Sequence, residues 1–521
     1  MKWRSAVELG TSNTFAGVSQ MSIDSNGNGF VFWAQSDGTY NSIYASRYST
    51  GTWGSALELD NTSLNADYYP ANMDVNGNIF VPFRQDDGTG TNIYMRRYSS
   101  SSDTWSSALA LAPYVSNSSL PRVYSLDTNG NALFVYPQTV GSYIHTYARS
   151  YNAGTATWSA PMKLDTAAYN SAPQLTTPDA NGNAFVVFTQ TDVSGHPSLY
   201  VRRYTASTDS WSPAAELDTT TNNASTPIAL TDANGNAFVA WIQSDGSYNS
   251  AYLRRYVAGT GTWSAASEID TTTFNAVSPT SLTLDNDGNV WILWTQLDGT
   301  GANSIYARRY NAATDTLNAA VEVDTSSYHA IGGRLQKDSS GNLFVSWTQS
   351  NGTYNSAFVR RYYASTSTWG PAIELDTTTY NASSSRFLLD VSTGNGFAVY
   401  IQSDGTYNSV YVRRYNASTD TWGIPMELDT SAYNAIPAGT SIDAAGNAIF
   451  TWTQSDGTYM SYYARRYESS SNTWSPAVEL DTSTYDANTA LLVSNSANGK
   501  AITAWGQSDG THISVYARAF E

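Results

Sequence analysis

Residues 285–296 read Asp-Asn-Asp-Gly-Asn-Val-Trp-Ile-Leu-Trp-Thr-Gln, a polar turn followed by a continuous apolar run. Asn and Gly in a short turn between two apolar segments are a strong signal for a β-hairpin. The run 290–296 predicts a buried strand, and the alternating segment 279–285 predicts the strand that pairs with it.

Two more strands follow in the same stretch of sequence. Residues 304–310 come after a polar loop, and residues 317–323 come after a second turn at 311–315. Neither segment shows a helical period. The stretch therefore predicts four antiparallel strands, named here a (279–285), b (290–296), c (304–310) and d (317–323).

This unit repeats along the whole chain. One marker is a Trp in a Trp-x-x-Ala-x-Glu-Leu-Asp-like context, which returns after 50 to 54 residues at Trp3, Trp53, Trp105, Trp158, Trp211, Trp263, Trp369, Trp422 and Trp474, with Leu317 in the one gap. The other marker is a Gln before a turn of the Asp-Gly type, at Gln35, Gln85, Gln138, Gln190, Gln243, Gln296, Gln349, Gln402, Gln454 and Gln507. With Leu317 counted in the place of the missing Trp, each marker occurs ten times, which predicts ten repeats.

Four antiparallel strands per repeat, without linkers, predict an all-β fold: a single β-propeller of ten four-stranded antiparallel blades over residues 1–521. The repeats begin near residues 10, 61, 113, 166, 219, 271, 325, 377, 430 and 482. The last repeat stops before its d strand, so we expect residues 2–9 to complete that blade and close the ring. The alternatives are two five-bladed propellers joined near residue 270 and, less favoured, an open solenoid.

The composition excludes several classes of function. The chain has 26 Lys and Arg against 43 Asp and Glu, a net charge of −17, which argues against nucleic acid as a partner. It has no Cys, so disulfides, thiolate metal sites and Cys nucleophiles are excluded. No apolar run approaches the ~18 residues of a membrane-spanning helix, so we expect no membrane insertion.

The repeats resemble two groups of propellers. The c–d turn followed by Thr421-Trp422 is similar to the blades of BNR/Asp-box propellers, which include sialidases and sortilin-type ectodomains, although Tyr415, Ala417 and Thr419 replace the Ser, Asp and Gly of the Asp-box. The pattern Asp232-Ala-Asn-Gly-Asn236, Trp241, Gln243, Asp245-Gly246, Tyr252, Arg255-Tyr256 more closely resembles repeats of uncharacterised bacterial surface or secreted proteins. That resemblance implies an extracellular or cell-surface location and no particular activity.

Two recurring loops carry the candidate binding residues. The d–a connections and the b–c loops both contain Tyr and Asn, and propeller geometry places both kinds of loop on one face. Aromatic rings stack on sugar rings, and amide and carboxylate groups recognise hydroxyls. The candidate ligand-binding residues are Tyr40, Asn41, Tyr248, Asn249, Tyr354, Asn355, Tyr407, Asn408 and Tyr459 in the b–c loops, and Tyr169, Asn170, Tyr380, Asn381, Tyr433 and Asn434 in the d–a connections.

Structural explanations compete with each functional one. The loop Tyr could pack over the chain below while Asp and Asn stabilise turns. The repeated Arg-Arg-Tyr of strand c indicates an arginine–carboxylate contact within or between blades, rather than a substrate-binding cluster. The Asp-x-Asn-Gly-Asn turns resemble the start of a calcium loop, but no Glu follows at the EF-hand spacing, so we expect no metal and no cofactor, with calcium as the alternative.

The sequence therefore favours a non-enzymatic binding or scaffold protein, with multivalent, lectin-like carbohydrate recognition as its function. No position combines an acid/base pair with a nucleophile outside the repeat, so we expect no catalytic residues. The alternatives are a structural surface or adhesion module that binds protein and, less favoured, a sialidase-like glycosidase. The expected partner is a glycan or a surface protein; the sequence leaves the oligomeric state open.

Overall fold

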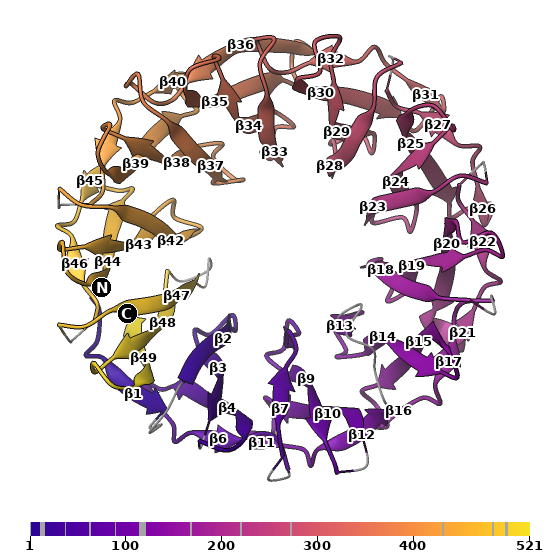
Figure 1. Cartoon of the computed structure of the whole chain (residues 1–521), viewed down its shortest axis with the longest axis horizontal. Coiled ribbons are helices and arrows are strands. Elements are labelled where there is room, and N and C mark those ends of the chain that lie inside the picture. The colour runs from indigo at the N-terminus through magenta and orange to yellow at the C-terminus, as the bar shows by residue number, and fades with distance from the viewer. Residues whose placement is uncertain are drawn as a thin grey trace. The chain divides into compact units, whose positions relative to one another are not determined.

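The architecture described here is that of a computed structural model of the chain, shown in Figure 1. It describes residues 2–10, 16–36, 38–61, 64–88, 90–113, 121–166, 169–218, 221–270, 273–429, 432–481, 484–494 and 499–521. In these residues the chain forms ten small antiparallel sheets and one short 3-10 helix, η1 (Ala206–Thr208). The fold is a ten-bladed β-propeller, as the sequence predicts.

One blade illustrates how the sequence makes the sheet. Strands β28 (Ala276–Leu284), β29 (Val290–Leu297) and β30 (Asn303–Asn311) are the predicted a, b and c strands, and they pair in that order. The predicted d strand is two short pieces, β31 (Thr316–Leu317) and β32 (Val321–Glu322), both paired with β30. Most blades divide their outer strand in this way, so most sheets have five strands; two have four, and the sheet of β7–β12 has six because its first strand is also divided.

The outer strand is divided because its register shifts by one residue. Tyr310 pairs with Leu317, whereas Tyr306 pairs with Glu322. The shift is a bulge, and a bulge leaves ladder groups without a strand partner. The guanidinium of Arg308 donates from Nε to the carbonyl of Asn318, inside the bulge, at 2.6 Å. The first Arg of Arg-Arg-Tyr thus donates to a backbone carbonyl of the bulge that has no partner in the strand ladder.

The same arginine also joins neighbouring blades, but not through a carboxylate. Arg308 Nη1 donates to the backbone carbonyl of Ile269 in the blade before it, at 2.5 Å. Arg413 donates to the carbonyl of Glu374 at 2.9 Å in the equivalent way. The predicted arginine–carboxylate contact is therefore wrong for the first Arg: the repeated Glu contributes its carbonyl, because its side chain points to solvent. The second Arg does approach carboxylates, as in the Arg47–Asp103 pair at 2.6 Å.

The turns between strands a and b are held by their own Asp and Asn. Asp285 Oδ1 accepts hydrogen bonds from the backbone N–H groups of Asp287 and Asn289, both at 2.9 Å. Gly288 has φ +79°, a conformation that favours glycine. Asn289 Oδ1 in turn accepts from the backbone N–H of Ala312 in the c–d turn, at 3.0 Å. The Asp-x-Asn-Gly-Asn motif therefore stabilises the a–b turn and links it by a hydrogen bond to the c–d turn of the same blade.

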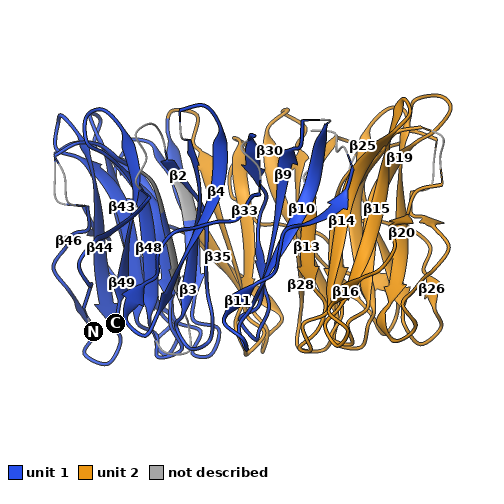
Figure 2. Cartoon of the chain, turned by 90° about the horizontal axis from the view of Figure 1, so that it is seen from below, with its two compact units in different colours: residues 1–113, 354–357, 374–521 blue, residues 114–353, 358–373 orange. Residues whose placement is uncertain are grey.

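Two compact units divide the chain, as Figure 2 shows by colour. Unit 1 comprises residues 1–113, 354–357 and 374–521, and unit 2 comprises residues 114–353 and 358–373. The blades of unit 1 contain β1 (Val7–Gly10), β2 (Ala16–Ile23), β3 (Gly29–Ser36), β4 (Asn41–Ser49), β5 (Thr52–Trp53), β6 (Leu57–Glu58), β7 (Ala66–Tyr68), β8 (Asn72–Met73), β9 (Ile79–Asp86), β10 (Thr91–Ser99), β11 (Thr104–Trp105), β12 (Leu109–Ala112), β37 (Ala382–Leu389), β38 (Gly396–Ser403), β39 (Asn408–Asn416), β40 (Thr421–Trp422), β41 (Met426–Glu427), β42 (Ala435–Ile442), β43 (Ala448–Ser455), β44 (Met460–Glu468), β45 (Thr473–Trp474), β46 (Val478–Glu479), β47 (Ala487–Ser494), β48 (Ala501–Ser508) and β49 (Ile513–Phe520).

Unit 2 holds the blade of β28–β32 and four others. Their strands are β13 (Arg122–Ser125), β14 (Ala132–Val140), β15 (Tyr143–Asn152), β16 (Thr157–Trp158), β17 (Met162–Lys163), β18 (Ser171–Pro178), β19 (Ala184–Thr191), β20 (Pro197–Thr205), β21 (Ser210–Trp211), β22 (Ala215–Glu216), β23 (Ala224–Thr231), β24 (Ala237–Ser244), β25 (Asn249–Val257), β26 (Thr262–Trp263), β27 (Ser267–Glu268), β33 (Ala330–Lys337), β34 (Leu343–Ser350), β35 (Asn355–Tyr363) and β36 (Thr368–Glu374).

Cores lie between successive blades of each unit. Phe238 and Ile269 of one blade and Ile292 and Trp294 of the next belong to one buried cluster in unit 2. This cluster spans residue 270, where two five-bladed propellers would have to separate. That alternative is therefore wrong. Strand b contributes to the clusters on both of its sides, which explains why its sequence is a continuous apolar run.

The N-terminal strand completes the C-terminal blade, as predicted. β1 pairs antiparallel with β49, with Glu8 opposite Tyr516, and Trp3 forms a bridge with Phe520. The Trp3 and Phe520 rings meet edge to face at 5.2 Å. Arg4 adds an ion pair with Glu521 at 2.6 Å. The predicted strand 2–9 is observed as β1 together with this bridge.

Deleting residues 2–10 should expose the edge of β49. We expect the variant to lose at least ~3 kcal/mol of unfolding free energy, because a packed Trp and a strand are removed, and to self-associate through the open edge. Chemical denaturation and size-exclusion chromatography measure the two effects. Moving residues 2–10 to follow Glu521 should restore both properties, and a deletion variant as stable and monomeric as the full chain would contradict the closure.

Candidate functional site

The d–a connections and b–c loops of unit 1 meet through pairs of tyrosines. Tyr407 of a b–c loop contacts Tyr433 of the following d–a connection, with ring centroids 5.3 Å apart and planes at 64°. Tyr459 contacts Tyr485 in the same way, at 5.4 Å. We name Tyr380, Tyr407, Tyr433, Tyr459 and Tyr485 the tyrosine belt. Both kinds of loop therefore share one face, as the sequence predicts.

Loop glycines hold the belt in place. A Cβ added to Gly405 would lie 2.7 Å from Cζ of Tyr380, and one added to Gly457 would lie 2.6 Å from Cζ of Tyr433. Both glycines have positive φ, +98° and +99°. Each position requires glycine for two reasons: its positive φ and the close approach of the Tyr ring. Each d–a Tyr of the belt thus rests on the b–c loop of the blade that it enters.

The d–a members of the belt are the more exposed ones. Tyr380 is 48% exposed, and Tyr433 and Tyr485 are each 38% exposed. Tyr407 and Tyr459 of the b–c loops are half-buried. Large aromatic side chains with this exposure at successive equivalent positions form a repeated apolar surface among polar loops.

Carboxylates lie beside the rings, and backbone donors keep them ionised. Asp404 Oδ1 accepts from the backbone N–H groups of Thr406 and Tyr407 at 2.7 and 2.8 Å. These hydrogen bonds, first that of Tyr407, lower the pKa of Asp404, which is fully exposed. Asp456 follows the same pattern. Each b–c loop of this form therefore presents a charged carboxylate at neutral pH.

The two kinds of Asn differ in role. Asn434 of the d–a connection accepts from the backbone N–H of Asn408 through Oδ1, at 2.9 Å, so it fixes the start of the c strand. Among the described residues, the Nδ2 group of Asn434 and the amide of Asn408 have no hydrogen-bond partner, and both side chains are exposed. The structural explanation thus accounts for one atom of Asn434 and leaves the other polar atoms facing solvent.

The d–a connection itself is anchored by a buried Asp. In unit 2, Asp324 Oδ1 accepts from the backbone N–H of Ile305 at 2.6 Å, and its Oδ2 accepts from Gln349 Nε2 at 3.0 Å. Gln349 Oε1 accepts from the indole of Trp347 at 3.2 Å and from the backbone N–H of Thr325 at 3.3 Å. We name this Asp, Gln and Trp arrangement the joint node. The Asp–Gln contact recurs between Asp270 and Gln296 at 3.4 Å, so the repeated Gln has a structural role at these joints.

Burial raises the pKa of the joint-node Asp in most blades. Desolvation is the largest cause, and it outweighs the backbone hydrogen bond that favours the charged form. The pKa is raised from 3.8 to about 6 at Asp218, Asp270, Asp324, Asp376, Asp429 and Asp481. Because the same environment recurs from blade to blade, the shift belongs to the architecture of the joint.

The structure places each predicted site residue at the end of a blade where d–a and b–c segments lie. In unit 1, Asn41 donates its backbone N–H to Asn65, Asn355 donates to Asn381, and Tyr40 and Tyr354 are half-buried. In unit 2, Tyr169 contacts Tyr143 at 5.5 Å, Asn170 accepts from Ile144, and Tyr248 is 42% exposed, beside the exposed Asn249. Contacts between belt residues join Tyr407 to Tyr433 and Tyr459 to Tyr485, not all the candidates together.

Sequence reasoning missed three exposed aromatics of the same kind. Phe274, Tyr328 and Tyr485 occupy the d–a position and are 40%, 49% and 38% exposed. Tyr328 contacts Gly352 as Tyr380 contacts Gly405. Their spacing from the preceding Asp matches that of Tyr380, so the repeat itself is the signal that could have found them.

The described residues contain no group of three or more His, Asp or Glu that could hold a metal ion, and no helix among them is long and apolar enough to cross a membrane. At the Asp-x-Asn-Gly-Asn turns, both Asp oxygens already accept hydrogen bonds, as Asp74 does from Asn76, Asn78 and the Asn78 side chain.

The joint node predicts an unusual pH dependence of stability. Since the folded-state pKa of Asp429 lies above the unfolded one, the folded state binds protons more tightly between about pH 4 and 6, and the free energy of unfolding falls as pH rises through this window. Asp429→Asn should remove ~1–2 kcal/mol of that fall, after allowance for solvent screening. Urea denaturation at pH 4.5 and 7.5 measures it.

The matched control for this measurement is Asp404→Asn, because Asp404 is exposed and its pKa is shifted in the opposite direction. It should leave the fall between pH 4.5 and 7.5 in place. If Asp429→Asn shows the same pH dependence as the unchanged protein, the joint-node Asp is not protonated in the folded state.

Comparison with known protein-family models and with curated proteins finds no match for this chain. Solved structures similar to it include a eukaryotic initiation factor (9% identity, TM-score 0.47, covering 79% of this chain and 87% of that one) and a polysaccharide lyase (10%, 0.37, 80% and 100%). A Hadza microbial sialidase is also similar (12%, 0.30, 62% and 74%). At these identities and TM-scores, none of the likenesses assigns an activity or a ligand to this chain.

Proposed function

We propose that this chain is a non-enzymatic, multivalent carbohydrate-binding protein that acts outside the cell or at its surface. The observation that carries the proposal is the tyrosine belt: exposed rings, held on loop glycines, at the same position of successive blades. A ring of this kind offers a flat apolar surface to the C–H face of a sugar. Preorganisation by Gly405 and Gly457 means that little side-chain entropy is lost on binding.

Polar groups beside each ring supply the hydrogen bonds that sugar recognition needs. Asp404 presents a charged carboxylate, and Asn408 and Asn434 present amide groups, all within the loops that carry Tyr407 and Tyr433. Carboxylate and amide groups together can accept from and donate to hydroxyls. The belt therefore combines the two kinds of group found in polar small-molecule sites.

Repetition suits weak, summed binding. Equivalent loops recur in three successive blades of unit 1, so a polymer with repeated sugars could occupy several of them at once. Linked weak sites raise the overall affinity by ~10²–10⁴-fold without any new contact. The ligand expected from this arrangement is a polysaccharide chain rather than a single monosaccharide.

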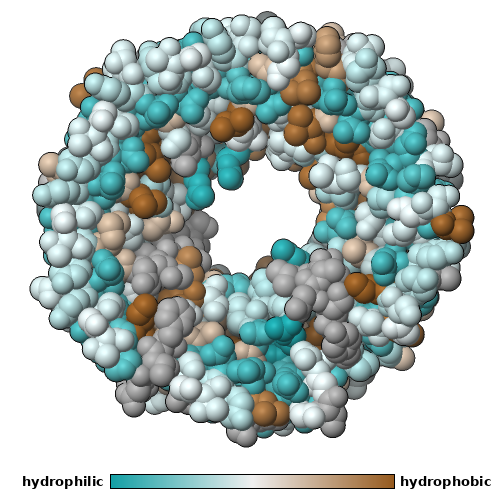
Figure 3. All heavy atoms as spheres, in the orientation of Figure 1, coloured by the Kyte–Doolittle hydropathy of each residue, from teal (hydrophilic) through white to brown (hydrophobic). Residues whose placement is uncertain are grey.

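A protein-binding adhesion module is the second candidate. Figure 3 shows one face of the molecule, on which hydrophobic side chains occur as separate spots among hydrophilic ones, a surface that suits a polar ligand. The cores of protein interfaces are more apolar and contiguous than this. A glycosidase is the least favoured candidate, since the acids with raised pKa recur at one equivalent position of six blades, where each accepts a hydrogen bond from its own c strand, as Asp429 does from Val410.

A glycan array compared with a triple variant tests the proposal. The unchanged protein should bind at least one polysaccharide, and Tyr380→Ala/Tyr433→Ala/Tyr485→Ala should bind it at least ~100-fold more weakly, because each lost platform costs ~1 kcal/mol and the avidity is lost as well. Ile424→Ala is the control, since Ile424 is 89% exposed and lies outside the belt. It should bind as the unchanged protein does.

Two results would overturn the proposal. One is an array without signal together with capture of a protein partner that depends on the belt, which would favour the adhesion module. The other is glycan binding that the triple variant retains in full. Thermal melting of the variant accompanies the array, so that loss of the fold is distinguished from loss of the site.

A further inference from the structure

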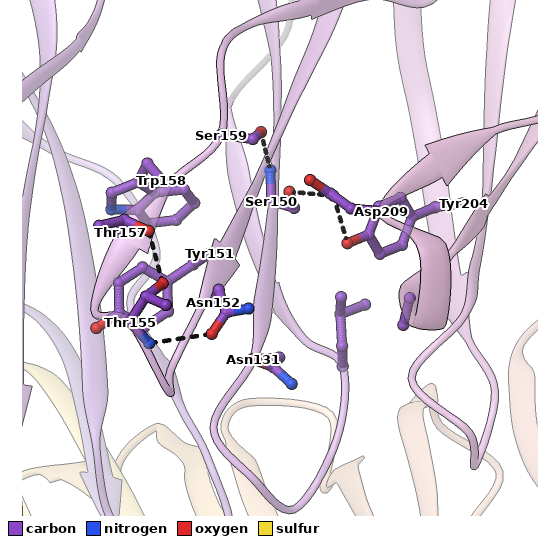
Figure 4. A pocket seen from close by; sticks show the side chains of 12 residues that line it. Asn131, Ser150, Tyr151, Asn152, Thr155, Thr157, Trp158, Ser159, Tyr204 and Asp209 are labelled. Atoms are coloured by element: carbon purple, nitrogen blue, oxygen red, sulfur yellow. Dashed lines mark hydrogen bonds between the residues drawn. The ribbon is translucent and has the colours of Figure 1, made fainter.

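A cavity of about 220 Å³ lies between two blades of unit 2, at the end that carries the a–b and c–d turns. Its lining includes Ser150 and Trp158 from the blade of β13–β17, and Tyr204 and Asp209 from the blade of β18–β22. Figure 4 shows Ser150, Asp209 and Tyr204 turned toward one another. The belt lies in unit 1 and at the other kind of loop, so this cavity is independent of the proposed carbohydrate site.

At several other blade interfaces a guanidinium occupies the equivalent place. The second Arg of Arg-Arg-Tyr reaches across to the Tyr of the next blade: Arg47 lies 5.4 Å from the ring centroid of Tyr98, and Arg414 lies 5.3 Å from that of Tyr467. Arg47 also pairs with Asp103, the turn residue that accepts the Tyr98 hydroxyl. A cation, an aromatic ring and a turn carboxylate thus make up the usual arrangement.

The interface with the cavity keeps two of these parts and lacks the third. Asp209 is the turn carboxylate, with φ +46°, and its Oδ1 accepts the Tyr204 hydroxyl at 2.8 Å. Ser150 stands where most other blades have the second Arg, and its hydroxyl donates to the same Oδ1 at 2.7 Å. Leu133 also replaces the aromatic residue on which that Arg packs elsewhere, as Arg203 does on Phe185 at 5.8 Å.

Within the described residues, Asp209 Oδ2 has no hydrogen-bond partner and no cation pairs with Asp209. The other interface that lacks the second Arg, at Ala519, is supplied with Arg4, whose Nη2 lies 3.7 Å from a Cβ built on Gly51 of the next blade. That interface is thereby filled by the protein itself. The interface at Ser150 has no such substitute among the described residues.

A second cavity shows that space alone is not sufficient. The cavity of about 320 Å³ between β30 and β35 is lined by Asp285, Arg309 and Ser367. Its carboxylate already pairs with Arg309 of the same blade, and Ser367 replaces the turn Asp. A further cation gains less there, because Arg309 already pairs with both carboxylates that line this cavity, Asp285 and Asp287.

We propose that the cavity at Ser150 binds an alkylguanidinium group in the place that an arginine of the protein fills elsewhere. The planar cation would lie over the Tyr204 ring and donate to Asp209 Oδ2, which matches the fork geometry of a guanidinium. The group could come from a free small molecule or from an arginine side chain of another polypeptide. The chain's net charge of −17 favours the approach of a cationic ligand from either source.

Titration of the whole chain with agmatine, followed by calorimetry, tests the proposal. We expect a dissociation constant on the order of 1 mM, as suits a small ligand with one ion pair and one stacked face. Methylurea, which is planar and neutral, should not bind detectably. A short peptide with a central Arg forms the second arm: binding equal to or tighter than that of agmatine assigns the site to a polypeptide, and binding of agmatine alone assigns it to a small molecule.

Ser150→Arg should fill the cavity from within, raise the melting temperature and weaken agmatine binding at least about tenfold. Asp209→Asn, which can still accept the Tyr204 hydroxyl, should weaken agmatine binding by a similar factor if the first variant does not fold. Asp315→Asn is the matched control, because Arg255 occupies its interface, and it should bind agmatine as the unchanged protein does. Equal binding by all three variants, equal binding of methylurea, or no binding of agmatine would overturn the proposal.

Discussion

The joint node is the interaction on which the loops and their candidate site depend. A buried Asp at the end of one blade accepts from its own c strand, as Asp324 does from Ile305, while a Gln of the next blade ties the same connection to a buried Trp. Each d–a connection leaves the node in one direction. The exposed Tyr that follows is therefore brought to the same place over the b–c loop in each blade that carries it.

That constraint explains how the loops of the repeat can be polar and still be held in place. Between-blade cores form from strand b, whereas the loops are held by hydrogen bonds of Asp, Asn and Gln rather than by apolar packing. Since the loops contribute little to the cores, their exposed rings and amides are available for a ligand.

Much of this arrangement could be predicted from the sequence, because period, turn residues and apolar runs are local signals. The spacing of Trp and Gln predicts the blades, and residues 2–9 predict the closing strand. What could not be predicted depends on three-dimensional contact: the division of strand d by a bulge, the use of Glu374 through its carbonyl instead of its carboxylate, and the greater exposure of Tyr380 than of Tyr407. Asp209 and Ser150 are 59 residues apart in the sequence, so no local signal predicts their hydrogen bond.

The central claim is that the exposed tyrosines of the belt contact a carbohydrate directly. Nuclear magnetic resonance of ring-labelled tyrosine, recorded during titration with a polysaccharide, tests it most directly. The account predicts shifts in the ring signals of Tyr380, Tyr433 and Tyr485, which are exposed, and none in those of the buried Tyr462 and Tyr467. Binding that leaves the three belt signals unchanged would contradict it.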